Sequence, residues 1–132
     1  MNTSINRIEA IVDSIAALHE FHKPDSEAYQ LRNPLLLKSF AAPGKHDIDE
    51  KGRRKFGSFL GGYKSAYYDV ELKVKGGSST GLKPTDKLKN LLAVYGIKQE
   101  ADQLSVVYYL RKALTNKDLD LTTPLSYFTE KK

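Results

Sequence analysis

The sequence predicts an all-α fold, an irregular single-domain bundle of five or six helices covering residues 1–132. One observation is that apolar residues recur at the spacing of one helix face in several segments. Another is the composition, in which 40% hydrophobic and 28% charged residues are ordinary for a globular domain of this length. The chain also lacks a pair of alternating polar and apolar segments that could form a sheet.

The first predicted helix begins at Thr3 or Ser4, either of which can serve as its N-cap. We expect it to end near His22, because a proline such as Pro24 disfavours the helical conformation in the residue before it. Its predicted core face consists of Ile5, Ile8, Ile11, Val12, Ile15 and Leu18.

Two shorter helical segments are expected next. Ser26, or Asp25 before it, can cap a short turn, and Asn33 can cap a helix over residues 35–40. Pro34 fits the first position of that helix, since proline has no N–H to leave unpaired there. Residues 41–44 then form a predicted loop.

The segment 49–75 is predicted to contain a long amphipathic helix. Its latter part, 66–75, also alternates apolar and charged residues and is compatible with a short β segment. We favour helix because no second alternating segment is present, although a strand pairing across a dimer stays open as an alternative. The apolar stripe comprises Phe56, Phe59, Leu60, Tyr63, Tyr67, Val70 and Val74.

The C-terminal third predicts a flexible glycine- and serine-rich loop at 76–83 and two further helices. The first begins at residues 84–86 and ends at Gly96. The second runs from about Gln99 to Leu114, and its apolar residues cover so much of the circumference that we expect it at the centre of the bundle. Thr123 and Pro124 open a last short turn, and the tail at 129–132 should fray.

A face of small residues is predicted on the middle helix, opposite the apolar stripe. Gly57, Gly61 and Ser65 are spaced four residues apart, with Ser58 and Gly62 beside them. Glycine in a helix costs roughly 1 kcal/mol relative to alanine, so a compensating contact is expected. Close packing of a second helix is the favoured interpretation. A ligand or a second subunit at this face, or a bend at the glycines, remains an alternative.

The net charge of +5 is concentrated in the middle of the chain. Residues 38–90 hold twelve basic and six acidic side chains, and four of the bases fall within residues 51–55. Such clusters favour contacts to phosphate groups. The leading hypothesis is therefore a non-enzymatic protein that binds nucleic acid through phosphates. The candidate binding residues are Lys51, Arg53, Arg54, Lys55, Lys64, Lys73, Lys75, Lys83 and Lys87.

The alternative hypothesis is a protein–protein adaptor or assembly subunit, with a homodimer as one form. Its interface would use the small-residue face at Gly57, Gly61 and Ser65, or the tyrosine-rich helix that carries Tyr108 and Tyr109. One exposed patch of Tyr108, Tyr109, Tyr127 and Phe128 would favour a protein partner, whereas convergence of the basic residues on one face would favour nucleic acid.

Catalysis, metal binding and cofactors are not predicted. His19 and His22 have a spacing that can hold a metal, but no third ligand is evident, and histidines hydrogen-bonded at a helix end are the favoured interpretation. The chain has no cysteine, no apolar run long enough to span a membrane, and charges within its first residues that do not suit a signal peptide. We therefore expect a soluble cytoplasmic protein.

Overall fold

The computed structural model describes residues 6–38, 47–48, 51–77 and 80–129. Five α-helices, one short 3-10 helix and a minimal two-stranded hairpin make up this part of the chain, which confirms the predicted all-α class. The helices are α1 (Arg7–Leu18), α2 (Glu27–Leu31), α3 (Phe59–Val74), α4 (Leu88–Val94), α5 (Glu100–Leu114) and the 3-10 helix η1 (Leu125–Thr129). The strands are β1 (Asp47–Ile48) and β2 (Arg54–Lys55), paired antiparallel.

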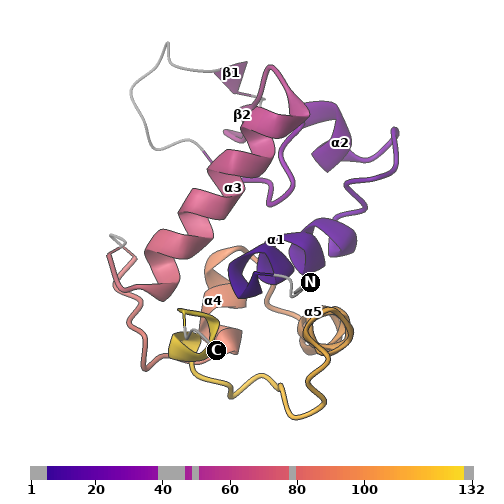
Figure 1. Ribbon diagram of the computed structural model, residues 1–132. Helices are drawn as coiled ribbons and strands as arrows, with labels where there is room; N and C mark the ends of the chain where they lie inside the picture. The colour runs from indigo at the N-terminus through magenta and orange to yellow at the C-terminus, as the bar shows by residue number, and fades with distance from the viewer. Residues whose placement is uncertain (1–5, 39–46, 49–50, 78–79, 130–132) are drawn as a thin grey trace, which may run out of the picture.

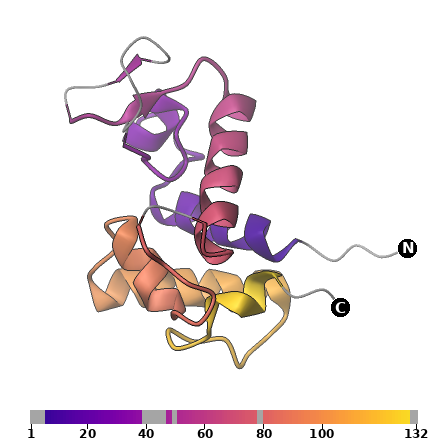
Figure 2. The ribbon, with the colours of Figure 1, turned by 90° about the vertical axis from the view of Figure 1, so that its left-hand side faces the viewer.

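The elements form two tiers joined by α3 (Figure 2). The lower tier consists of α1, α4, α5 and η1, and the upper tier consists of α2, β1, β2 and the segment 33–38. Helix α3 runs from the hairpin in the upper tier down to the lower tier, where its last turns pack on α1 and η1 (Figure 1). One hydrophobic cluster fills the lower tier and extends up to Leu35 and Leu37.

Helix α1 is the central helix of the lower tier. Its residues Ile11, Val12 and Ile15 are fully buried, and it contacts α3, α5 and η1. The predicted core face is therefore confirmed from Ile8 onward, whereas Asn6 rather than Thr3 or Ser4 is the N-cap. The Asn6 side chain accepts hydrogen bonds from the first backbone N–H groups of α1, and the helix ends at Leu18, a turn earlier than predicted. Residues 1–5, including both predicted caps, lie outside the described residues.

The predicted helix over 35–40 is wrong within its described part. Ser26 does cap α2 as predicted, but residues 34–38 form a turn and an extended bridge. Leu36 has a left-handed backbone, with φ of 53°, and the Leu37 N–H donates to the Asn33 side chain at 2.8 Å. The Asn33 side chain thus replaces the backbone bonds of a helix with a local bond of its own. Residues 39–46 are outside the described part.

The middle helix begins later than predicted. Residues 51–58 form a turn, β2 and a cap, and the helix α3 starts at Phe59 after Ser58, whose side chain accepts from the Gly61 N–H. Gly52 allows the turn before β2, because it has a left-handed φ of 81°. From Phe59 to Val74 the helix prediction is confirmed, including the segment that could have been strand.

The apolar stripe of α3 is buried only in its lower half. Val70 and Val74 are fully buried, whereas Phe59 and Leu60 at the upper end are 39% and 64% exposed. Tyr63 and Tyr67 lie between, partly buried, and Phe56 precedes the helix. The apolar stripe therefore predicts the buried residues of α3 correctly in the lower tier but not in the upper tier.

The C-terminal helices follow the prediction with two differences. Helix α4 starts at Leu88, because Asp86 caps the preceding turn through the Lys83 N–H instead of opening the helix. Helix α5 is not central, since only one face, with Val106, Val107 and Leu110, is buried. The left-handed Gly96 after α4 and the turn η1 after Pro124 are as predicted. Residues 78–79 of the glycine- and serine-rich loop and residues 130–132 of the tail are outside the described part.

Candidate anion-binding cleft

A cleft of about 410 Å³ opens between the two tiers. The segment 35–38 and β2 form one wall, α3 contributes the floor through Asp69 and Lys73, and the end of α4 with the turn after it forms the other wall. Among the described residues, four cationic side chains and one carboxylate line it, which gives this part of the lining a formal charge of +3. The cations are Lys38, Arg54, Lys73 and Lys98, and the carboxylate is Asp69.

The fully buried Asn33 side chain positions the upper wall. Its amide donates to the carbonyl oxygens of Leu37 and Arg54, each at 3.0 Å, and its carbonyl accepts from the Leu37 N–H. Backbone bonds complete the arrangement, with the Arg54 N–H donating to the Leu37 carbonyl at 2.9 Å and a bridge between Lys38 and Arg53. Lys38 and Arg54 are thereby placed on adjacent extended segments beside the cleft.

On the floor of the cleft, Asp69 accepts two hydrogen bonds at the same oxygen. Lys73 Nζ lies 2.6 Å and the Tyr95 hydroxyl 2.5 Å from Asp69 Oδ2. The Lys73 ammonium also lies 5.0 Å from the centre of the Tyr95 ring. Burial, followed by the Asp69 charge, raises the pKa of Tyr95 well above its usual value, so the hydroxyl stays a proton donor. The carboxylate in this wall is therefore already neutralised.

Arg54 differs from Lys73 because no carboxylate of the described residues forms an ion pair with it. Its Nε is buried and has no hydrogen-bond acceptor among the described residues. A buried donor without a partner costs roughly 1–3 kcal/mol. The Arg54 side chain lines a cleft with excess positive charge. An anion bound there would therefore supply the hydrogen-bond acceptor that its buried Nε lacks in the described part of the chain.

Four of the nine predicted phosphate-binding residues form ion pairs within the protein. Arg53 donates from both terminal nitrogens to the two carboxylate oxygens of Glu27, at 3.0 and 3.2 Å, and Lys51 lies 3.5 Å from the same carboxylate. These cations lower the pKa of Glu27. Lys75 pairs with Glu71 at 3.1 Å, and Lys73 with Asp69 as described. Their positive charges are thus largely compensated.

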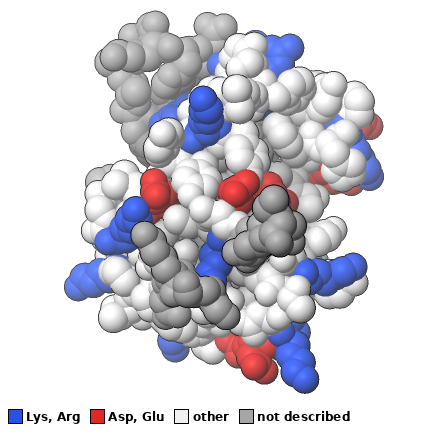
Figure 3. Space-filling model, in the orientation of Figure 1, with Lys and Arg blue, Asp and Glu red and all other residues white. Residues whose placement is uncertain are grey.

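The other predicted cations do not converge on one face. Lys55, Lys64, Lys83 and Lys87 are exposed, and no ion pair is found for them among the described residues. Lys64 precedes Asp69 by five residues, which places it roughly 140° around α3 from the cleft floor. On the face in Figure 3, Lys and Arg side chains are spread out and stand beside acidic ones. Of the predicted set, only Arg54 and Lys73 line the cleft, whereas Lys51 and Arg53 meet on the carboxylate of Glu27.

Lys38 and Lys98 belong to the cleft but were not predicted. Lys38 is an isolated base in a segment expected to be helical, and Lys98 lies just after the C-terminus of α4. The left-handed Gly96, which ends α4 and turns the chain, was the sequence signal closest to this site, because it fixes where the following residues point.

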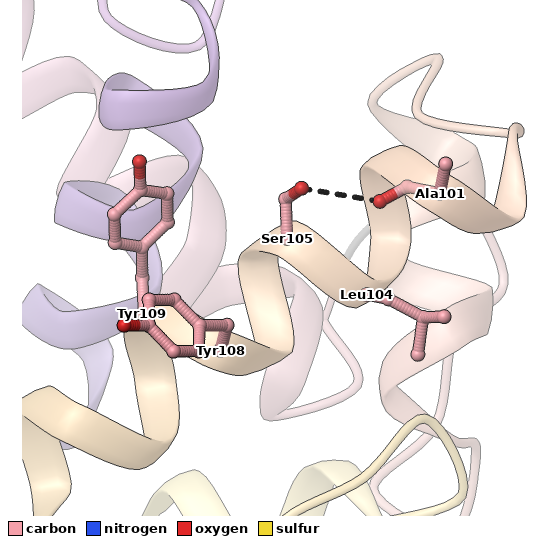
Figure 4. Close-up of a pocket in the computed structure, with 5 residues that line it drawn as sticks. All are labelled: Ala101, Leu104, Ser105, Tyr108 and Tyr109. Atoms are coloured by element: carbon pink, nitrogen blue, oxygen red, sulfur yellow. Dashed lines mark hydrogen bonds between the residues drawn. The ribbon is translucent and has the colours of Figure 1, made fainter.

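The residues of the predicted protein interface lie at two separate places. Gly57 is exposed, Gly61 and Ser65 are partly buried, and their neighbour Gly62 is buried against the backbone of Arg32 rather than against a second helix. Tyr108 and Tyr109 are 58% and 41% exposed on α5, where they line a shallow groove with Ala101, Leu104 and Ser105 (Figure 4). Tyr127 and Phe128 do not extend this patch, since Phe128 is buried and Tyr127 partly buried.

Within the described residues, no cluster of three or more histidine or acidic side chains could hold a metal ion, and no helix is long and apolar enough to cross a membrane. Comparisons with protein-family models, curated proteins and solved structures find no significant match to this chain.

Proposed function

We propose that the protein is a non-enzymatic binding protein that engages nucleic acid through phosphate groups, with the cleft between the tiers as its main contact. The observation that carries the proposal is the buried Nε of Arg54, which has no hydrogen-bond partner among the described residues, in a cleft that Lys38 and Lys98 also line. Arginine and lysine are the usual phosphate contacts in proteins that bind nucleic acid.

The size of the cleft suits a small part of a nucleic acid. Ligand sites of about 300–1,000 Å³ accommodate small organic molecules, and this cleft lies near the lower end of that range. It therefore fits one phosphate with its attached nucleoside, and not a duplex. The exposed Lys55, Lys64, Lys83 and Lys87 would add a general positive field that attracts the rest of a single strand.

The proposal is tested with a fluorescent single-stranded oligonucleotide and a pair of charge-matched double variants. Lys38→Gln with Lys98→Gln removes two exposed cleft cations, whereas Lys89→Gln with Lys117→Gln removes two exposed cations elsewhere. The cleft variant should bind about tenfold more weakly at low salt, and the control should lose less than about twofold.

Salt dependence provides the second measurement. Loss of two phosphate contacts should make the plot of log affinity against log salt shallower by roughly 1.4, because each contact on a single strand contributes about 0.7. Equal weakening in the two double variants would show that net charge alone matters and would overturn the cleft as the binding site. Lack of binding by the native chain at low salt would overturn the function itself.

A protein partner is the second candidate function, favoured by the exposed side chains Leu104 and Tyr108 on α5. Apolar surface on a monomer commonly marks an interaction site. This surface is distinct from the cleft, so binding of a protein there is compatible with binding of an anion between the tiers.

A further inference from the structure

We propose that α5 pairs with the α5 helix of a second copy of this chain, antiparallel, about a two-fold axis beside Ser105. This proposal concerns a different surface from the cleft and does not depend on the proposed function. It follows from the shape of the outer face of α5 and from the order of charges along it.

The outer face has the spacing of a helix-pairing seam. Ala101, Leu104, Ser105 and Tyr108 follow one another at positions i, i+3, i+4 and i+7, the pattern with which one helix packs on another. Leu104 is 51% and Tyr108 58% exposed, and together the four residues and Tyr109 line a shallow groove of about 320 Å³. Figure 4 shows these side chains along one side of the helix, with Ser105 between Ala101 and the two tyrosines.

Ser105 is suited to the crossing point. Its hydroxyl donates to the Ala101 carbonyl at 3.1 Å, so the only polar group at the middle of the seam is already satisfied within the helix. Small side chains at the point of closest approach allow two helices to pack tightly, while the larger Leu104 and Tyr108 fill the space on either side. Tyr108 is also held in place, since its ring packs edge-on against Tyr109 at 5.9 Å.

The charges along α5 favour a second copy in the antiparallel direction. Acidic residues occupy the first turn, Glu100 and Asp102, and basic residues the last, Arg111 and Lys112. A parallel pair would place like charges opposite each other, whereas an antiparallel pair places each acidic end beside a basic end. Arg111 donates through Nε to the Leu119 carbonyl at 2.6 Å, which orients the guanidinium and leaves its other N–H groups for a carboxylate.

Two residue pairs independently place the axis at the same point. Glu100 and Arg111 are eleven residues apart, which is about three full turns of an α-helix. They therefore lie on the same flank of the seam. In an antiparallel pair related by a two-fold axis, each flank faces the same flank of the copy, so Glu100 meets Arg111 of the copy if the axis passes between residues 105 and 106. Asp102 and Tyr109 share the other flank and have the same midpoint, which lets the tyrosine hydroxyl donate to the carboxylate of the copy.

Cysteine cross-linking tests this register directly, because the native chain contains no cysteine. Ser105→Cys puts a thiol beside its own copy at the axis, whereas Ala101→Cys puts the two thiols roughly 13 Å apart along the helices, at 1.5 Å per residue. A disulfide requires the two Cα atoms within about 7 Å. Under mild oxidation Ser105→Cys should form covalent dimers at least tenfold faster than Ala101→Cys.

Exchange of charges provides the second test, by light scattering or sedimentation at protein concentrations up to about 1 mM. Glu100→Arg and Arg111→Glu should each shift the native dimer toward monomer, and the double variant should restore the dimer, because the pairs re-form with reversed sign. A chain that stays monomeric at this concentration, or cross-linking as fast through residue 101 as through residue 105, would overturn the proposal. Failure of the double variant to recover, while circular dichroism shows native helix, would overturn the register.

Discussion

The two tiers of the molecule are held together by different kinds of interaction. In the lower tier, α1, α4, α5 and η1 bury apolar faces in one cluster, and single side chains such as Ile11 and Leu91 are fully enclosed. In the upper tier, a few buried apolar residues are accompanied by specific polar contacts, among them the Asn33 side chain and the Arg53–Glu27 pair. Apolar faces tolerate many sequences, whereas polar contacts and close backbone approaches depend on single residues.

This difference explains where binding groups occur. The extended segments of the upper tier bring cations toward the lower tier's edge, and the cleft forms at the junction. The opposite side of the cleft is supplied by α3 and the end of α4, where Lys73 and Tyr95 both donate hydrogen bonds to Asp69. A change on either side of this junction can therefore alter the cleft.

The largest effect is expected from Gly62→Ala. A Cβ atom at this position would lie 1.7 Å from the carbonyl oxygen of Arg32, much closer than any tolerated contact, so the backbone of the upper tier has to move away from α3. We expect a loss of about 4 kcal/mol in the free energy of unfolding, measured by urea denaturation. Hydrogen exchange should increase in α2 and β2 first.

Gly57→Ala is the matched control for this change. No heavy atom comes within 4 Å of a Cβ built there, and the residue precedes α3 instead of packing against another segment. Its stability should stay within about 0.5 kcal/mol of the native protein. Equal losses for the two glycines would mean that helix or chain flexibility, and not the contact with Arg32, is what Gly62 provides.

A smaller but still large effect is expected from Asn33→Ala. The substitution removes three hydrogen bonds from a fully buried side chain and leaves the Leu37 N–H without its partner. The expected loss is about 3 kcal/mol, because buried backbone groups left unpaired carry the full cost of desolvation.

Hydrogen exchange distinguishes this local effect from a general one. In Asn33→Ala the amides of residues 35–38 and 54 should exchange faster, while those of α1 and α5 stay near native protection. If α1 and α5 lose protection to the same extent, the two tiers unfold as one unit. Their different kinds of contact then do not give them different local stabilities.

The contrast also explains how much of the fold the sequence could predict. Helices α1, α3 and α5 carry strong helical periodicity or caps, and their existence was predicted together with the core residues Ile11, Ile15 and Val70. The errors concentrate in the upper tier and the approach to α3. Asn33 followed by Pro34 is a pattern that can begin a helix, but it is equally compatible with the turn found here. The pattern alone therefore does not distinguish the two structures.

The candidate site could be predicted only in part. A count of bases identifies Arg54 and Lys73, but cannot show that Arg53, the residue next to Arg54, is paired with Glu27, 26 positions away in the chain. Lys38 and Lys98 are isolated in sequence and line the same cleft because residues 34–38 form a turn and a bridge to β2 in place of a helix. Long-range pairing of this kind is decided by tertiary packing, which leaves no local pattern.

The smallest effect, and the sharpest contrast with Asn33, concerns His19 at the C-terminus of α1. Its Nε2 is buried without a hydrogen-bond partner among the described residues, and burial lowers its pKa, with Asp102 opposing and Arg53 reinforcing the shift. Because the folded pKa lies below the unfolded value near 6.5, the unfolded chain takes up a proton first as the pH falls. Stability should be complete above that value, decrease below it, and level off once the folded histidine is also protonated.

His19→Gln should remove this component, which is measured by urea denaturation from about pH 7.5 to 5. The native protein should lose stability over this range, and the variant should show a flatter profile. His22→Gln, at an exposed position three residues later, is the control and should keep the native slope. The acidic groups with lowered pKa, such as Glu27 and Asp120, act at lower pH and do not produce a change in this window. Identical slopes in the native and His19→Gln proteins would show that solvent reaches the ring and that, in contrast to Asn33, its burial has no energetic consequence.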